Sequence, residues 1–300
     1  MIRRRRAIPW ILCALLLTGC WNGRVLFSFE EPFWASLGGD LRLKASLAGD
    51  AARRGYLARI DVGAGASEPL KALVSRVSTG KFAVVIVGPF LSFDWASYVR
   101  SYPQTRFVLV DAATPALDPP SNAVFLTFDR TRAFQEAGRA AAESIRSMSG
   151  ARSPTAPVSE LGPRIAVLTS DDSGLTVSEM DAFMRGVADS LSGGRPVTRS
   201  LSAPQDKNSI RAAVDQMRHD GAKIFLFGLG QNDPFGLEAL RDGGGSAVVA
   251  DWEASGAFAA QVLASIEEDV PGGILRALDA VQKGVSHVDG PVKLVSGKKI

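Results

Sequence analysis

The stretch Phe82-Ala-Val-Val-Ile-Val-Gly-Pro89 indicates the fold of this chain most directly. Its first six residues are all apolar, and a Gly-Pro pair ends the run. An unbroken apolar run of this length is typical of a strand buried on both faces, as strands of parallel sheets are. The Gly-Pro pair predicts a turn into the next element.

Further strands and helices alternate on both sides of this run. The predicted strands are Arg24–Phe29, Tyr56–Val62, Phe82–Val87, Phe107–Asp111, Val124–Phe128, Arg164–Thr169, Val197–Leu201, Lys223–Phe227 and Ala247–Asp251. The predicted helices are Phe33–Leu47, Glu68–Val77, Phe93–Ser101, Arg130–Met148, Ser178–Leu191, Lys207–His219, Pro234–Arg241 and a stretch near 255–283 that Pro271-Gly-Gly273 breaks. Such alternation predicts βαβ units and parallel sheets.

We therefore predict an α/β protein with two doubly wound parallel-sheet lobes joined by a hinge. Lobe 1 takes residues 24–128 and about 253–284, because the late helix is expected to return to it. Lobe 2 takes residues 129–252 and about 285–300.

The first twenty residues resemble an export signal. Arg3 to Arg6 form a positive segment, Ala7 to Leu17 form an apolar run, and Leu17-Thr18-Gly19-Cys20 looks like the lipobox of bacterial lipoproteins. The apolar run is shorter than the ~20 residues that a spanning helix needs. This resemblance implies a signal peptide at residues 1–19, lipid on Cys20 and a tether at residues 20–23. The alternatives are an N-terminal anchor or a cleaved signal with an incidental cysteine.

Charge and cysteine content follow from that cleavage. Four of the 34 Lys and Arg residues, and none of the 31 Asp and Glu residues, lie in residues 1–19, so the remainder carries a formal charge of −1 instead of +3. No basic surface is expected, which argues against nucleic acid as a partner. The second cysteine, Cys13, leaves with the signal, so we expect no internal disulfide.

Four segments carry a resemblance to a known family: Tyr102 to Asp111, Asn122 to Phe128 with Phe134 and Gly138, Arg164 to Leu168 with Phe183 and Gly186, and Val248 to Asp251 with Val262 to Val270. In order and spacing they resemble type I periplasmic binding proteins, and more narrowly the basic membrane protein family of substrate-binding lipoproteins of ABC transporters. This resemblance implies a purine nucleoside or a related compound as the ligand.

Two departures weaken the nucleoside assignment. The family's Asp-x-Ser-Phe-Asn signature is replaced by Phe29-Glu-Glu-Pro-Phe-Trp34, which keeps only an aromatic residue. The lysine expected after the fourth segment is replaced by Glu267-Glu268. The scaffold therefore carries over better than the nucleoside specificity.

Candidate ligand-binding residues come from the rule that ligands of doubly wound sheets lie beyond the carboxyl ends of the strands. Stacking faces and hydrogen-bond acceptors at those ends are the expected contacts. The candidates are Glu30, Phe33, Trp34, Phe90, Asp129, Asp171, Asp251 and Trp252. Packing of a helix start against its sheet is the alternative for the aromatics, and helix capping for Asp129 and Asp171.

Catalysis has little support in the sequence. His219 and His287 lie in polar surroundings, and the HExxH, GxSxG and GxxxxGK[ST] motifs are absent. We expect no enzyme activity, no cofactor and no metal site.

We expect a monomeric solute-binding lipoprotein, held by lipid on the periplasmic or cell-surface side of a membrane, that presents a small ligand to an ABC-transporter permease. A sensor or accessory lipoprotein with the same fold is the alternative. A hydrolase lacks its residues, and a repressor needs a DNA-binding segment where the signal stands.

Overall fold

The computed structural model describes residues 22–63, 69–112, 118–149, 164–170, 175–191, 196–202, 206–250 and 256–297. These residues form two compact units. Unit 1 contains the residues up to Phe128 together with Asp269–Pro291, and unit 2 contains Asp129–Glu268 and the residues from Val292 onward. The chain therefore passes between the units three times.

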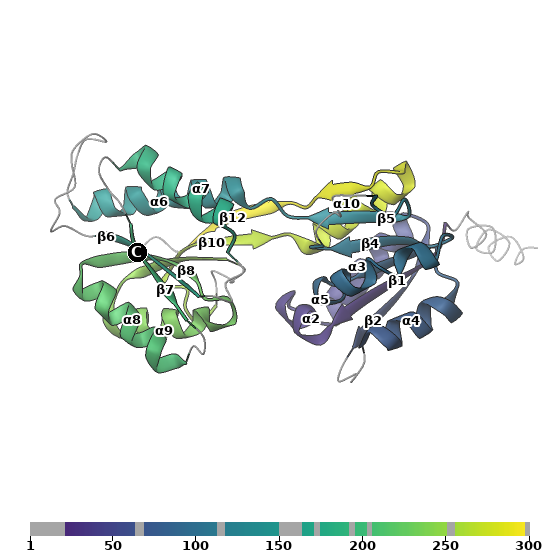
Figure 1. Cartoon of the computed structure of the whole chain (residues 1–300), viewed down its shortest axis with the longest axis horizontal. Coiled ribbons are helices and arrows are strands. Elements are labelled where there is room, and N and C mark those ends of the chain that lie inside the picture. The colour runs from purple at the N-terminus through teal and green to yellow at the C-terminus, as the bar shows by residue number, and fades with distance from the viewer. Residues whose placement is uncertain are drawn as a thin grey trace, which may run out of the picture. The chain divides into compact units, whose positions relative to one another are not determined.

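Unit 1 is a six-stranded sheet with helices on both faces (Figure 1). Its elements are β1 (Gly23–Glu30), α2 (Glu31–Ser36), α3 (Leu41–Arg53), β2 (Tyr56–Gly63), α4 (Pro69–Gly80), β3 (Val84–Val87), α5 (Pro89–Trp95), the 3-10 turn η1 (Val99–Ser101), β4 (Arg106–Val110), β5 (Ala123–Thr127), α10 (Val270–Lys283) and β11 (His287–Asp289). The strand order is β11-β5-β4-β3-β1-β2, and every pair is parallel.

Unit 2 repeats this plan. Its elements are α6 (Thr131–Met148), β6 (Arg164–Ser170), α7 (Val177–Ser190), β7 (Val197–Leu201), α8 (Lys207–His219), β8 (Ala222–Gly228), the 3-10 turn η2 (Gly230–Asn232), α9 (Asp233–Gly243), β9 (Ser246–Ala250), β10 (Val262–Glu268) and β12 (Val292–Ser296). The strand order is β12-β10-β9-β8-β6-β7, and only β12 is antiparallel to its neighbour.

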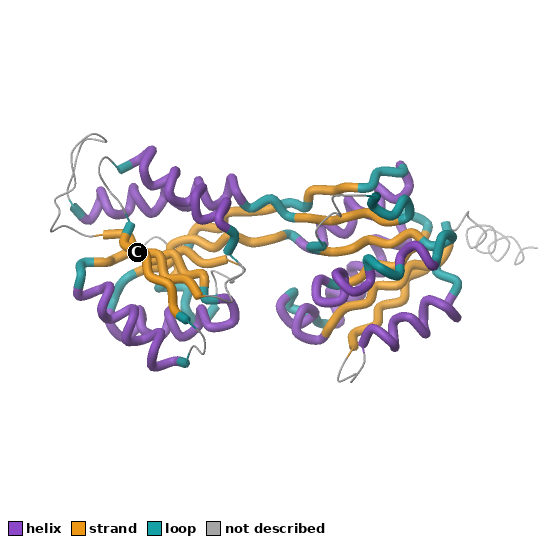
Figure 2. The backbone as a smooth tube through the Cα atoms, in the orientation of Figure 1, coloured by secondary structure: helices purple, strands orange, loops and turns teal. Residues whose placement is uncertain are grey.

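Alternation along the strands divides each core into two layers. In β3, Val84 and Ile86 join the core under α3 and α10, whereas Val85 and Val87 join the core under α4 and α5. Successive side chains of a strand point to opposite faces, so an all-apolar strand serves both layers. In unit 2, α6 and α7 cover one face of the sheet and α8 and α9 the other. The strands of each unit form a layer between its helices (Figure 2).

The predicted α/β class with two parallel-sheet lobes is confirmed. Two helix predictions were wrong in their bounds. The predicted helix Phe33–Leu47 is two helices, because the chain turns at Gly38, whose φ of 65° lies in the left-handed region that glycine tolerates. The predicted helix Phe93–Ser101 starts earlier, at Pro89, and continues as η1.

The late segment near 255–283 was predicted to be helical and to belong to lobe 1, and this was wrong for its first part. Residues Val262–Glu268 form β10, which pairs with β9 on one side and β12 on the other, inside unit 2. Backbone pairing on both sides outweighs the helical preference of its Ala, Leu and Glu residues. The assignment of 285–300 to lobe 2 was wrong only up to Pro291, because β11 pairs with β5 in unit 1, whereas the residues from Val292 onward belong to unit 2.

Candidate functional site

Each sheet has one point where the strand order reverses. In unit 1 the chain goes from β1 outward to β2 and then back to β3 on the other side of β1. In unit 2 it goes from β6 to β7 and then to β8 on the other side of β6. At such a switch point the connections leave in opposite directions, so an open crevice forms beyond the carboxyl ends of the two central strands.

The switch point of unit 1 is formed by Glu30 at the end of β1 and Gly88 just after β3. The Gly88 amide donates to Ser28 O at 3.0 Å, which extends the β1–β3 pairing to this point. Glu30 Oε1 accepts a hydrogen bond from the Leu91 amide at 2.6 Å, whereas Oε2 is buried without a partner. A side chain at residue 88 would collide with Glu30 Oε2, so glycine is required for the carboxyl group to lie here.

Burial raises the pKa of the Glu30 carboxyl, because removal from water disfavours the charged form. Hydrogen bonds from backbone amides, including that of Leu91, lower the pKa by less than burial raises it. The partly buried position of Glu30 at the end of β1 therefore increases the affinity of its carboxyl group for a proton.

The switch point of unit 2 is formed by Ser170 at the end of β6 and Gly228 at the end of β8. Thr169 is in register with Gly228, and Ser170 with Leu201 of β7. The Ser170 side chain is buried and its Oγ has no hydrogen-bond partner among the described residues. The loop after Gly228 is fixed, because Asp233 Oδ1 accepts from the Leu229 amide at 2.9 Å.

Buried polar atoms almost always have partners, so each exception needs a cause. In the described part of the chain three buried side-chain atoms lack one: Glu30 Oε2, Ser170 Oγ and Trp95 Nε1. Two of the three lie at the two switch points. Both units therefore present an unused hydrogen-bonding group, beside a glycine, at the position where doubly wound sheets bind ligands.

The predicted aromatic contacts have different positions. Phe33 is partly buried, packs edge-on against Phe29 at 5.6 Å between ring centroids, and lies next to Gly88. Trp34 is 4% exposed, with its ring stacked on Phe29 on one side and Lys44 Nζ 5.6 Å from its centroid. Its ring is part of the core, so the prediction that Trp34 stacks on a ligand needs correction. Only the backbone position of Phe90, in α5, is described.

Asp129 is exposed and begins unit 2. Its Oδ1 accepts from the Thr131 amide at 2.9 Å, and hydrogen bonds from the side chain and the backbone of Thr131 lower the pKa of its carboxyl. This hydrogen bond forms a turn just before α6, whose N-cap is Arg130 without a side-chain cap, so Asp129 is not the N-cap that the alternative interpretation predicted. The other predicted positions, Cys20, Asp171, Asp251 and Trp252, lie outside the described residues.

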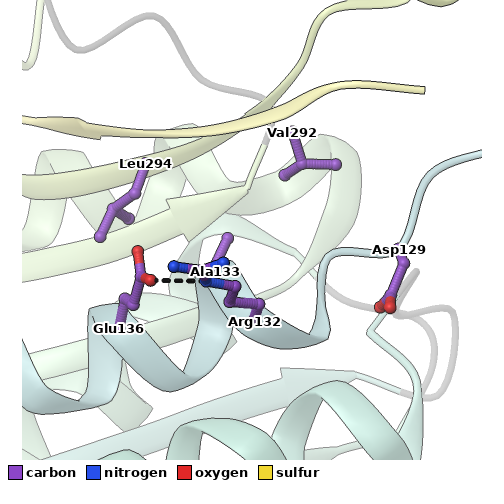
Figure 3. Close-up of a pocket in the computed structure, with 6 residues that line it drawn as sticks. All are labelled: Asp129, Arg132, Ala133, Glu136, Val292 and Leu294. Carbon is purple, nitrogen blue, oxygen red and sulfur yellow. Dashed lines mark hydrogen bonds and ion pairs between the residues drawn. The ribbon is translucent and has the colours of Figure 1, made fainter. Parts of the chain in front are cut away.

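Asp129 also lines a depression of about 290 Å³ between the start of α6 and β12 (Figure 3). We call it the α6–β12 groove; its residues are Asp129, Arg132, Ala133, Glu136, Val292 and Leu294. Val292 and Leu294 point from β12 toward α6, and Arg132 Nε donates to Glu136 Oε1 at 3.0 Å. The groove lies within unit 2 at β12, and β10, β9 and β8 lie between β12 and β6 in the sheet.

A buried ion network near the start of α6 was not predicted from the sequence. Arg130 Nε donates to Glu179 Oε1 at 2.6 Å, and Arg130 Nη1 lies 3.6 Å from Glu268 Oε1. Glu179 Oε2 accepts from the Thr176 amide at 2.7 Å, which completes a capping box at the start of α7. The Thr176-x-x-Glu179 spacing is a visible signal of the cap, but it does not reveal that Arg130 is the partner of Glu179.

Among the described residues, no group of three or more His, Cys, Asp and Glu side chains is placed to hold a metal ion. Within the same residues, no helix combines the length and the apolar character that a membrane crossing requires. His287 is exposed and its Nε2 lies 3.1 Å from Asp289 Oδ1 in unit 1.

No protein-family model and no curated protein sequence matches this chain. The narrower resemblance to the basic membrane protein family therefore stays a prediction. Solved structures do match the fold over nearly the whole chain.

An ABC transporter periplasmic solute-binding protein from Actinobacillus succinogenes with bound D-allose is similar at a TM-score of 0.62 and 12% identity, over 92% of this chain and 98% of that one. The Caulobacter myo-inositol binding protein bound to myo-inositol is similar at a TM-score of 0.56 and 18% identity, over 92% and 94%. A transcriptional activator of the comK gene from Bacillus halodurans is similar at a TM-score of 0.68 and 13% identity, over 93% and 92%.

These likenesses show that the chain has the fold of periplasmic solute-binding proteins of ABC transporters. The same fold occurs in a transcriptional activator. Fold alone therefore does not decide the function, and the residues at the switch points have to carry that argument.

Proposed function

We propose that this protein is a solute-binding protein that takes a small hydroxyl-bearing ligand at the carboxyl edges of its two sheets. The observation that supports this is the pair of unused polar atoms at equivalent positions, Glu30 Oε2 in unit 1 and Ser170 Oγ in unit 2. A hydrogen bond from a ligand would stabilise each atom, because each is a buried group that is unsatisfied in the absence of ligand.

Hydroxyl groups suit this pair chemically. A ligand hydroxyl both donates and accepts a hydrogen bond, so it can bond to the Glu30 carboxyl in either protonation state and to the Ser170 hydroxyl. Sugars and cyclic polyols carry several such groups, and the ribose of a nucleoside carries them too. The bound D-allose and myo-inositol of the similar structures agree with this ligand class. Phe33, beside Gly88, offers an apolar contact for a ring.

The cellular role follows from the predicted lipobox. We propose that lipid on Cys20 tethers the protein to a membrane on the periplasmic or cell-surface side and that it delivers ligand to an ABC permease, as a monomer. The role is binding rather than catalysis. A sensor or accessory lipoprotein with the same fold is the second candidate, and the likeness to a transcriptional activator favours keeping it, because this fold also serves proteins without a transport role.

Binding is tested by thermal shift and calorimetry of the chain without residues 1–19 against D-allose, D-ribose, myo-inositol, adenosine and guanosine. A ligand at about 100 times its Kd should stabilise the protein by ~2.7 kcal/mol. Stabilisation by none of the five, at concentrations up to the millimolar range, would remove the transport proposal in favour of the accessory one.

Matched variants then test the site. Glu30→Gln and Ser170→Ala should each weaken the bound ligand about tenfold, since each removes one hydrogen bond worth ~1–1.5 kcal/mol. The controls Glu31→Gln and Ser200→Ala change exposed neighbours and should leave affinity unchanged. Equal losses in variants and controls would contradict the site assignment while leaving the binding proposal intact.

The anchor has its own test. Cells that express the full chain should incorporate a labelled fatty acid into it, and Cys20→Ala should abolish the label. A labelled Cys20→Ala protein would contradict the lipid assignment.

A further inference from the structure

The α6–β12 groove combines one face of a strand with one stripe of a helix. Arg132, Ala133 and Glu136 lie on one side of the first two turns of α6, and Asp129 lies just before the helix, whose N-cap is Arg130. Val292 and Leu294 recur at i and i+2, so they share one face of β12. Val292 and Leu294 from β12, and Ala133 and Glu136 from α6, point toward the same depression (Figure 3).

The strand of this groove is at an edge of its sheet. β12 pairs with β10 through residues 292–296, and in the described part of the chain it has no strand on its other side. The backbone groups along a free edge are a template for one more strand. Addition of an extended peptide to such an edge, with its alternate side chains seated in an adjacent groove, is a recurrent mode of recognition.

The lining specifies which peptide fits. Ala133, Val292 and Leu294 form an apolar floor, and the lining contains two carboxylates, Asp129 just before α6 and Glu136 in its second turn. The only cation in the lining is Arg132, whose side chain is 89% exposed, and the side chain of its partner Glu136 is 43% exposed. Such an exposed ion pair contributes little to stability and can open. The groove therefore has an apolar centre and a net negative rim.

The dimensions agree with a short strand. Residues 131 to 136 span about 8 Å along the axis of α6, and Asp129 lies two residues before the helix. The outer side chains of a five-residue strand are about 13 Å apart. Five residues bury much less than the ~800 Å² per partner of a stable dimer interface. A transient partner segment fits this surface better than a second copy does.

We propose that the α6–β12 groove is a docking site for an extended segment of a partner protein, which adds to the free edge of β12. Its central apolar side chain lies against Ala133, Val292 and Leu294, and basic side chains two residues before and after it face Asp129 and Glu136. In the sheet of unit 2, β10, β9 and β8 lie between β12 and β6, the strand that carries Ser170.

The experiment uses the isotope-labelled chain without residues 1–19 and the capped peptide Lys-Thr-Val-Thr-Lys as the probe. NMR titration should shift the amide signals of residues 292–296 and of the first two turns of α6. The acidic analogue Glu-Thr-Val-Thr-Glu should bind at least tenfold more weakly. A version with N-methyl groups on the amides that would face β12 should not bind, because it cannot pair with the edge.

Variants separate the groove from adventitious binding. Asp129→Asn combined with Glu136→Gln should weaken the basic peptide about tenfold, and raised salt should do the same to the unchanged protein. Glu143→Gln, an exposed acid farther along α6, is the control and should have no effect. Shifts outside the groove only, equal binding of the three peptides, or no shifts at β12 with the basic peptide would each overturn the proposal.

Sedimentation of the unchanged protein over a wide concentration range tests whether a second copy of this chain, instead of a partner segment, occupies the groove. A monomer at all concentrations agrees with a partner segment. A concentration-dependent dimer that Leu294→Asp abolishes would assign the groove to a second copy and overturn the partner assignment.

Discussion

The crossing of α6 and α7 gives the sharpest stability prediction. The two helices approach each other through Gly138 and Gly186. A Cβ at Gly138 would lie well inside 3.0 Å of Phe183 O, and a Cβ at Gly186 well inside 3.0 Å of Gln135 O. The obstacle at each site is backbone, so no side-chain rotation can relieve it, and the helices must separate.

The magnitude follows from two opposing terms. Overpacking of a close contact costs up to ~3 kcal/mol when the backbone has to shift, while alanine is favoured over glycine inside a helix by ~1 kcal/mol. We expect Gly186→Ala to lower the free energy of unfolding by about 2 kcal/mol, or about 4–8 °C in Tm for a unit of this size. Gly49→Ala, in the middle of α3, is the control, because its Cβ would meet only Arg53 Nη1 at 3.9 Å. It should raise stability by ~0.5–1 kcal/mol.

Urea unfolding followed by far-UV circular dichroism measures both changes, and hydrogen exchange of α6 and α7 peptides locates the effect in unit 2. Gly138→Ala should behave like Gly186→Ala, and the double variant should cost less than the sum, because one shift of the helices relieves both contacts. If Gly186→Ala were as stabilising as Gly49→Ala, the close approach of the two helices would be refuted.

Three further predictions concern charges and caps. Arg130→Met leaves the buried Glu179 and its neighbour Glu268 without their cation, and it should lower the free energy of unfolding in urea by ~3–5 kcal/mol. The control Arg132→Met removes an exposed ion pair and should cost at most ~1 kcal/mol. Equal costs of the two variants would contradict the network. The pKa of Glu30 is raised above its ordinary value of 4.5, so the folded state holds this proton more tightly and stability falls as pH rises from about that value through the folded pKa. The free energy of unfolding of Glu30→Gln, relative to that of the unchanged protein, should therefore increase over that pH range. A difference between the two proteins that does not vary with pH would argue against the raised pKa. Asp269→Ala removes the side chain that accepts from the Gly272 amide at the start of α10 and should cost ~1 kcal/mol, with increased hydrogen exchange in that turn; unchanged exchange would contradict the cap.

Much of the fold could be predicted because burial on both faces leaves a simple trace in the sequence. β3 contributes Val84, Val85, Ile86 and Val87 to two core layers, so the run is apolar throughout. The predicted helix Lys207–His219 has the bounds of the amphipathic α8, in which the buried residues recur at helical spacing.

β10 could not be predicted, because its strand character comes from its neighbours. Val262-Leu-Ala-Ser-Ile-Glu-Glu268 contains good helix formers, and its partners β9 and β12 end 12 residues before it and begin 24 residues after it. Local sequence carries no record of such pairing. The misplaced boundary near residue 253 followed from this element, and the one near residue 285 followed from β11.

The candidate site was predictable in position but not in detail. The strand-end rule located Glu30, because it needs only the end of an apolar run. Whether Trp34 faces a ligand or the core depends on the turn at Gly38 and Gly39, which directs the chain back across the ring. The sequence could not show that Glu30 Oε2 and Ser170 Oγ are buried and have no hydrogen-bond partner among the described residues, because this depends on how those residues pack around them.

The three passages of the chain between the units have a consequence for biosynthesis. The core of unit 1 needs Ile274 and Leu278 of α10, and its sheet is completed by β11 at residues 287–289. A ribosome therefore has to synthesise nearly the whole chain before the segment made first can close its core. Until then the nascent chain exposes the apolar strands β1 and β3, so it depends on factors that hold unfolded chains. Under the proposed export this order is an advantage, since the chain stays unfolded until late in its synthesis.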